Sequence, residues 1–173
     1  MSDTDWTRIF REIYEEGLKH YAAGRRGAPE IFRGEQVRFL ESIGCSAQEL
    51  YDFVEDAVKY HEPDFATCLL ITAVRRDYFL QELKGRQTGG MVRMEELPAK
   101  TDAVEGIEWL PRLMAKARAK LRGEMNPDLM YGCGGDRAFA RQHGIHLADF
   151  LRLAWSAGDN DRVLIDFVKS KQG

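Results

Sequence analysis

The chain has 173 residues, with 25 basic and 28 acidic side chains and a formal net charge of -3. This length suits one domain or two small ones, and it allows a hydrophobic core without disulfide or metal staples. The charge balance disfavours nucleic-acid binding, because nucleic-acid-binding domains usually carry a basic excess. No apolar run approaches the roughly 20 residues that a bilayer-spanning helix requires, so we expect no membrane association.

The cysteine usage and the N-terminus indicate the compartment. Cys45, Cys68 and Cys133 are far apart in the sequence and form no paired motif. A sparse, odd number of cysteines is typical of reduced intracellular proteins. The first residues are acidic and do not resemble a secretory leader. The sequence therefore predicts a cytoplasmic protein.

The N-terminal half is predicted to be helical. Apolar side chains recur at three- and four-residue steps from Trp6 to Tyr21, which is the pattern of an amphipathic helix. A single turn over residues 30–33 and a helix over residues 35–43 are expected next. Ser46 and Glu49 form a capping-box pattern, which predicts the start of a helix that runs to about Tyr60.

Asp64 follows Pro63 and can cap another helix, over residues 65–84. The helix that Ser46 caps carries Asp52, Glu55 and Asp56 on its polar side, which we interpret as a solvated acidic face and not as a cation site. We expect residues 1–86 to form an N-terminal helical subdomain.

Residues 87–104 break the helical pattern. They contain Gly89, Gly90 and Pro98 and few apolar side chains. Residues 91–97 are expected to form either a short strand or an extended linker. The segment therefore predicts an irregular linker between two subdomains.

The C-terminal half, residues 105–173, again predicts helices. Pro111 marks a helix over residues 110–122, since proline is tolerated in the first turn. Asp136 is expected to cap a short helix over residues 137–143, and two more helices are expected over 147–157 and 162–169. The whole pattern predicts an all-α fold of two small helical subdomains joined by an irregular linker.

Three stretches of this half are distinctive, residues 107–112, 116–123 and 131–137. Through them, about residues 95–173 resemble a bacterial family described as domain of unknown function 5069. Phe139, the Gly144-Ile145 step and the acidic segment 159–166 agree more loosely. The resemblance implies a small helical fold and a bacterial source, and it implies no activity. The N-terminal half resembles no family in the same way.

The turn over residues 131–137 is the main candidate site. Arg112 and Lys116 are four residues apart, so they share a helix face that could point at this turn. Backbone N–H groups of its glycines, at a helix start near Asp136, would suit a phosphate or carboxylate, and Arg137 could add a bidentate contact. Tyr131 and Cys133 complete the candidate anion-binding set. The alternative is that Arg112 pairs with Asp136 and that the glycines only permit a tight turn.

Cys133 gives two further hypotheses. Nearby cations and a helix start would activate its thiol, with His143 or His146 as a base, although a buried structural cysteine is the commoner case. The second hypothesis is a zinc site made by Cys133, His143 and His146. These residues lack the close ligand spacing that is typical of zinc sites. We therefore expect no metal and no cofactor.

The function that we predict is a non-catalytic ligand-binding or protein-interaction module. The alternative is a small-molecule enzyme with an anion-binding site at the turn over residues 131–137. The expected partner is an unidentified small anion or a protein. The sequence is also compatible with a homodimer.

Overall fold

The protein is seen in a computed structural model that describes residues 5–171. Within these residues, nine α-helices and one two-stranded antiparallel sheet make up the regular structure, together with one short 3-10 helix. The predicted all-α fold class is confirmed. No helix in this range has the length and apolar character needed to cross a bilayer.

The chain divides into two compact units, Met1–Arg86 and Gln87–Gly173. Residues 87–104, for which we predicted a linker, fall within the second unit. Each unit has buried side chains of its own, and each is described separately below.

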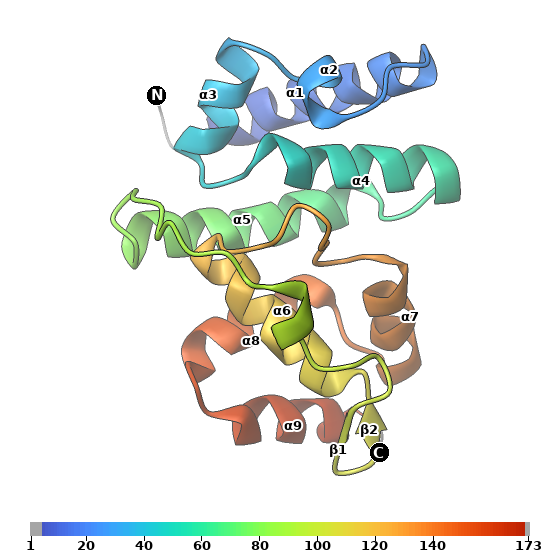
Figure 1. Ribbon diagram of the computed structural model, residues 1–173, viewed down its shortest axis with the longest axis vertical. Coiled ribbons are helices and arrows are strands. Elements are labelled where there is room, and N and C mark those ends of the chain that lie inside the picture. Colours follow the sequence, from blue (N-terminus) through green and yellow to red (C-terminus); the bar gives the residue numbers. More distant parts are fainter. Residues whose placement is uncertain (1–4, 172–173) are drawn as a thin grey trace. The chain divides into compact units, whose positions relative to one another are not determined.

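The first unit contains five helices (Figure 1). They are α1 (Asp5–Ala22), α2 (Ala28–Ile31), α3 (Glu35–Ser42), α4 (Ala47–Tyr60) and α5 (Phe65–Gln81). The predicted capping box starts α4: the Glu49 N–H donates to Ser46 Oγ at 3.1 Å, and the Ser46 N–H donates to Glu49 Oε2 at 2.7 Å. Asp64 caps α5 through the Thr67 N–H at 2.8 Å. The α5 helix ends at Gln81, three residues before the predicted end at Lys84.

Helices α1 and α4 pack together around a polar cluster. The Tyr21 and Tyr51 hydroxyls both donate to Glu55 Oε1, at 3.0 and 3.1 Å, and Lys59 Nζ lies 3.0 Å from the same oxygen. Our interpretation of Glu55 as part of a solvated acidic face was wrong, because this carboxylate is half-buried and joins two helices. Burial alone would raise the pKa of Glu55, but the hydrogen bonds from Lys59 and the tyrosines lower it overall.

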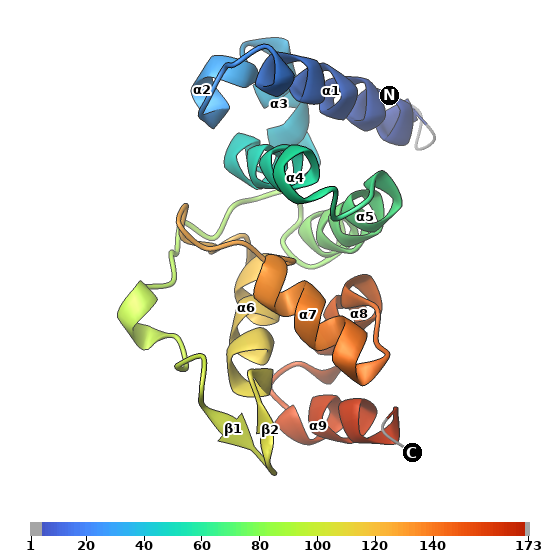
Figure 2. The same cartoon turned by 90° about the vertical axis from the view of Figure 1, so that its right-hand side faces the viewer.

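The second unit contains the remaining helices and the sheet (Figures 1 and 2). Its elements are the 3-10 helix η1 (Met94–Glu96), β1 (Ala103–Val104), β2 (Ile107–Glu108), α6 (Leu110–Arg122), α7 (Gly134–His143), α8 (Leu147–Ala157) and α9 (Asp161–Ser170). Helix α6 packs against α8 and α9 and supplies fully buried Leu110 and Leu113. Neither alternative that we gave for residues 91–97 describes them fully, since they include a 3-10 turn and the strands lie later in the chain.

Strands β1 and β2 form a hairpin with a two-residue turn. Val104 pairs with Ile107, and the turn residues Glu105 and Gly106 have φ values of 50° and 78°. Two successive residues with positive φ are the signature of a type I′ turn. Glu105 at the turn forms ion pairs with Arg162 and, at 2.6 Å, with Lys169 of α9. These contacts hold the hairpin beside α9.

Candidate functional site

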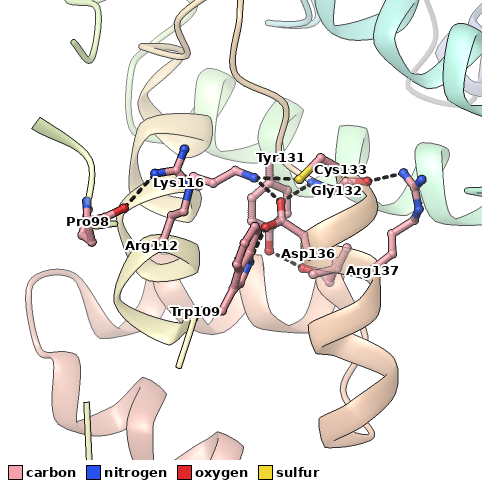
Figure 3. A network of polar contacts seen from close by, with 10 residues as sticks. Pro98, Trp109, Arg112, Lys116, Tyr131, Gly132, Cys133, Asp136 and Arg137 are labelled. Carbon is pink, nitrogen blue, oxygen red and sulfur yellow. Dashed lines mark hydrogen bonds and ion pairs between the residues drawn. The ribbon is translucent and has the colours of Figure 1, made fainter. Parts of the chain in front are cut away.

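A buried ion pair joins α6 to α7 in the second unit. Lys116 Nζ on α6 lies 2.5 Å from Asp136 Oδ2 on α7, and the two side chains are 1% and 0% exposed (Figure 3). Lys116 is one of the predicted site residues, and the ion pair with Asp136 neutralises its charge inside the protein. An ion pair that is excluded from water becomes costly to break when one partner is removed.

The Asp136 carboxylate also binds two neutral donors. The Gly132 N–H donates to Oδ2 at 2.8 Å, and the Trp109 indole N–H donates to Oδ1 at 2.9 Å. We call Trp109, Lys116, Gly132 and Asp136 the α6–α7 clamp, because their contacts connect α6 and the residue before it to the first turn of α7 and the residues before that helix. Sequence reasoning did not assign a site role to Trp109, whose indole is needed to satisfy the buried carboxylate.

Arg112 does not take part in the clamp. Its guanidinium donates to the Pro98 carbonyl at 2.7 Å, on the opposite side of α6 from the Asp136 contact in Figure 3. The suggested pairing of Arg112 with Asp136 was therefore wrong, and Lys116 occupies that place. Four-residue spacing put both cations on one side of α6, but their long side chains diverge toward different partners.

Tyr131 and Arg137 fix the turn that precedes α7. The Tyr131 hydroxyl donates to the Leu147 carbonyl at 2.8 Å, and Arg137 donates to the Gly132 carbonyl at 2.7 Å. Burial raises the pKa of Tyr131 well above its ordinary value of 10.0, and the negative charge of Asp136 raises it further. The phenol therefore stays neutral and acts as a hydrogen-bond donor to the backbone.

Cys133 lies directly before α7, which begins at Gly134 and not, as predicted, at Arg137. Cys133 is half-buried, and its sulfur lies 3.3 Å from Lys116 Nζ. His143 is at the opposite end of α7, about 15 Å away along the helix axis at the helical rise per residue. His146 caps α8, its Nδ1 accepting from the Ala148 N–H at 3.1 Å. The structure therefore does not pair the thiol with either predicted base.

The residues that the structure describes contain no group of three or more histidine, cysteine, aspartate or glutamate side chains placed to hold a metal ion. The arrangement considered for zinc, with Cys133, His143 and His146, is not assembled. The histidines serve other contacts: His146 caps a helix, and the His143 ring lies 4.2 Å from the Phe139 ring, centre to centre.

A cleft of about 600 Å³ opens beside the clamp. One wall is a single face of α7, with residues spaced as i, i+3, i+4, i+7 and i+8: Gly135, Ala138, Phe139, Gln142 and His143. The other wall is Lys100 and the segment from the hairpin turn through β2 to Trp109. We call this the α7 cleft. Its volume lies within the roughly 300–1,000 Å³ of typical small-molecule sites.

Trp109 connects the clamp to the α7 cleft. It has a φ of 70°, which is rare for a large side chain, and it directly precedes α6. Its ring packs so closely on Gly135 that a Cβ atom at that glycine would lie 2.3 Å from the ring. The indole is therefore fixed on both sides, by Asp136 and by the backbone of α7, and it provides a rigid cleft wall.

The polar groups of the α7 cleft are of several kinds. Glu105 is already paired with α9, whereas the structure shows no ion pair or hydrogen bond from another described residue to the side chains of Lys100, Glu108 or Gln142. Burial lowers the pKa of His143 below its ordinary value of 6.5, so its imidazole is neutral at neutral pH. The cleft therefore offers aromatic surface together with neutral and charged hydrogen-bonding groups.

No family model, no curated protein and no solved structure matches the chain.

Proposed function

We propose that the protein is a non-catalytic binding module and that its ligand occupies the α7 cleft. The observation that carries this proposal is the cleft itself, with about 600 Å³ of space and a wall made by Trp109, Phe139 and His143. Small-molecule sites usually combine apolar and aromatic walls with a few polar groups. The α7 cleft has aromatic groups in its wall and is more polar than most such sites, because Lys100, Glu108 and Gln142 also line it.

The contacts of the clamp support a binding role over catalysis at the neighbouring turn. Lys116 is neutralised by Asp136, and Asp136 itself accepts three hydrogen bonds. An anion brought to Lys116 would have to compete with a buried carboxylate at 2.5 Å. We infer that the turn is a structural support that positions Trp109 at the cleft.

A screen of small molecules by NMR tests this proposal. Backbone amide spectra of the full chain are recorded with a fragment library, for the wild type and for the Ala138→Trp variant. Ala138 is exposed on the α7 wall, so the larger side chain should fill the cleft without disturbing the core. Arg152→Trp is the matched control, since Arg152 is exposed on α8 and does not line the cleft.

We expect fragments that shift amide signals of β2 and α7 in the wild type and in Arg152→Trp, and that lose this effect in Ala138→Trp. The proposal would be overturned if no fragment of the library bound at the cleft. It would also be overturned if the fragments bound Ala138→Trp as they bind the wild type.

A second candidate is a small-molecule enzyme that acts at the turn over residues 131–137. The 3.3 Å contact between the Lys116 ammonium and the sulfur of half-buried Cys133 favours it, because a neighbouring cation stabilises a thiolate. Alkylation by iodoacetamide at neutral pH separates the two functions. If the enzyme hypothesis is right, the Cys133 thiol should react faster than free glutathione. If the turn is only a structural support, the Cys133 thiol should react more slowly than free glutathione.

The broader assignments are also proposals. On the residues that resemble the family of unknown function, we propose that about residues 95–173 belong to that bacterial family. We further propose a cytoplasmic location, consistent with the absence of a bilayer-spanning helix among the described residues. Size-exclusion chromatography with light scattering would show whether the protein forms a homodimer.

A further inference from the structure

Glu108 lines the α7 cleft, and its backbone N–H and C=O make no ladder hydrogen bond. The Trp109 N–H donates to the Asp102 carbonyl at 3.1 Å, and Ala103 pairs with Glu108 in the next register position. In an antiparallel ladder, hydrogen-bonded and non-hydrogen-bonded pairs alternate. The Ala103–Glu108 pair is therefore non-hydrogen-bonded, and the N–H and C=O of Glu108 both point away from β1.

These two backbone groups lie on the edge of β2 that has no strand partner. The cleft wall includes Ile107, Glu108 and Trp109 and contains no residue of β1. Among the described residues, none donates to or accepts from the Glu108 backbone. A donor and an acceptor therefore lie side by side at the rim of a cleft that also contains Trp109 and Phe139.

We propose that the ligand of the α7 cleft is a planar aromatic heterocycle with an adjacent N–H donor and carbonyl acceptor, as in a lactam. Its N–H would donate to the Glu108 carbonyl and its carbonyl would accept from the Glu108 N–H. The ring would lie against the aromatic wall of Trp109 and Phe139. This inference rests on the proposed function, and it adds the chemical class of the ligand.

Three features favour a flat heterocycle over an extended peptide. Strand β2 has two residues, and Glu108 is the one residue in it whose backbone faces outward, so a peptide strand would gain few ladder bonds. The indole of Trp109 is held rigidly by Asp136 at 2.9 Å and by the Gly135 backbone, which suits stacking against a flat ring. Phe139 and His143 add two further rings to the same wall, 4.2 Å apart centre to centre, which again suits a flat ligand.

A pair of probes tests the donor requirement. Isoquinolinone has the lactam edge, and N-methylisoquinolinone has the same ring system without the N–H. We expect the lactam to shift the Glu108 and Trp109 amide signals and to bind about tenfold more tightly, because the methylated probe leaves a backbone carbonyl without its donor.

A pair of variants tests the protein side. Glu108→Pro removes the outward N–H, which makes no ladder bond, and Glu108→Ala keeps that N–H while removing the side chain. We expect isoquinolinone to bind about tenfold more weakly to Glu108→Pro and unchanged to Glu108→Ala.

The results separate this inference from the proposed function. Equal binding of both probes, or equal binding to both variants, overturns the lactam inference and leaves the cleft as a binding site. Binding of neither probe also overturns it, and the fragment screen with Ala138→Trp then decides independently whether the cleft binds small molecules.

Discussion

Lys116 and Asp136 come from helices that are separated by a loop, yet their charged atoms lie 2.5 Å apart in the interior of the second unit. Gly132 and Trp109 complete the coordination of the carboxylate. The cluster uses the residue types of an anion-binding site, but each charge has its partner within the protein. The role of the cluster is structural, because it fixes the position of Trp109 at the edge of the α7 cleft.

Asp136→Asn should destabilise the protein strongly. The substitution conserves shape but leaves the buried ammonium of Lys116 without its counter-charge, and breaking a buried pair from one side costs about 3–5 kcal/mol. Lys116→Met should cost less, because Asp136 keeps two N–H donors. Urea unfolding measures both, and a double variant less destabilised than the sum of the single variants would show the coupling. A loss below about 1 kcal/mol for Asp136→Asn would show that the pair contributes little to stability.

Gly135→Ala should disturb the Trp109 wall. The new Cβ would lie 2.3 Å from the indole ring, so the ring or α7 has to move, at a cost of about 1–3 kcal/mol. Gly134→Ala is the matched control, because the nearest atom to its Cβ is the end of Arg137 at 3.8 Å. Near-ultraviolet circular dichroism and thermal unfolding should change for Gly135→Ala only. Identical behaviour of the two variants would contradict the packing described for Trp109.

Glu105→Gln should loosen the hairpin. The Glu105 carboxylate pairs with Arg162 and Lys169 of α9, and the hydrogen bonds and charges of these partners lower its pKa. We expect faster amide hydrogen exchange at Val104 and Ile107 in the variant. Added salt should reduce the difference from the wild type, because exposed ion pairs are screened. Unchanged exchange at low salt would mean that the hairpin holds its position without α9.

The stability of the first unit should depend on the ionisation of Glu55. Its pKa in the folded protein is lower than the ordinary value of 4.5, so the unfolded chain takes up a proton first as the pH falls. The contribution of Glu55 is therefore complete above about pH 4.5 and is lost as the pH falls through the lower folded pKa. Unfolding free energies of the wild type and Glu55→Gln should converge over that range. A constant difference from neutral pH to pH 3 would refute the assignment.

Local sequence signals predicted much of the fold. The Ser46 and Glu49 pair fixed the start of α4, and Pro111 fixed the start of α6, because capping and proline geometry depend on neighbouring residues alone. The start of α7 was predicted too late. Gly134 and Gly135 are poor helix formers, and they are helical here where the Trp109 ring covers Gly135 and leaves no room for a side chain.

The site was less predictable, because it depends on contacts between elements. Spacing placed Arg112 and Lys116 on one side of α6, but it could not show that only Lys116 reaches Asp136. The hairpin turn, Glu105 and Gly106, lacks the usual asparagine or aspartate before glycine, and its strands have two residues each. The hairpin forms one wall of the α7 cleft. The cleft could therefore not be predicted without the hairpin.

Crystallographic fragment soaking most directly tests the claim that a ligand occupies the α7 cleft. The account predicts that planar fragments gather in the cleft, in contact with Trp109 and Phe139, while Lys116 and Asp136 stay paired. Fragments or anions that leave the cleft empty and bind at Lys116, displacing Asp136, would contradict the account and favour a site at the turn.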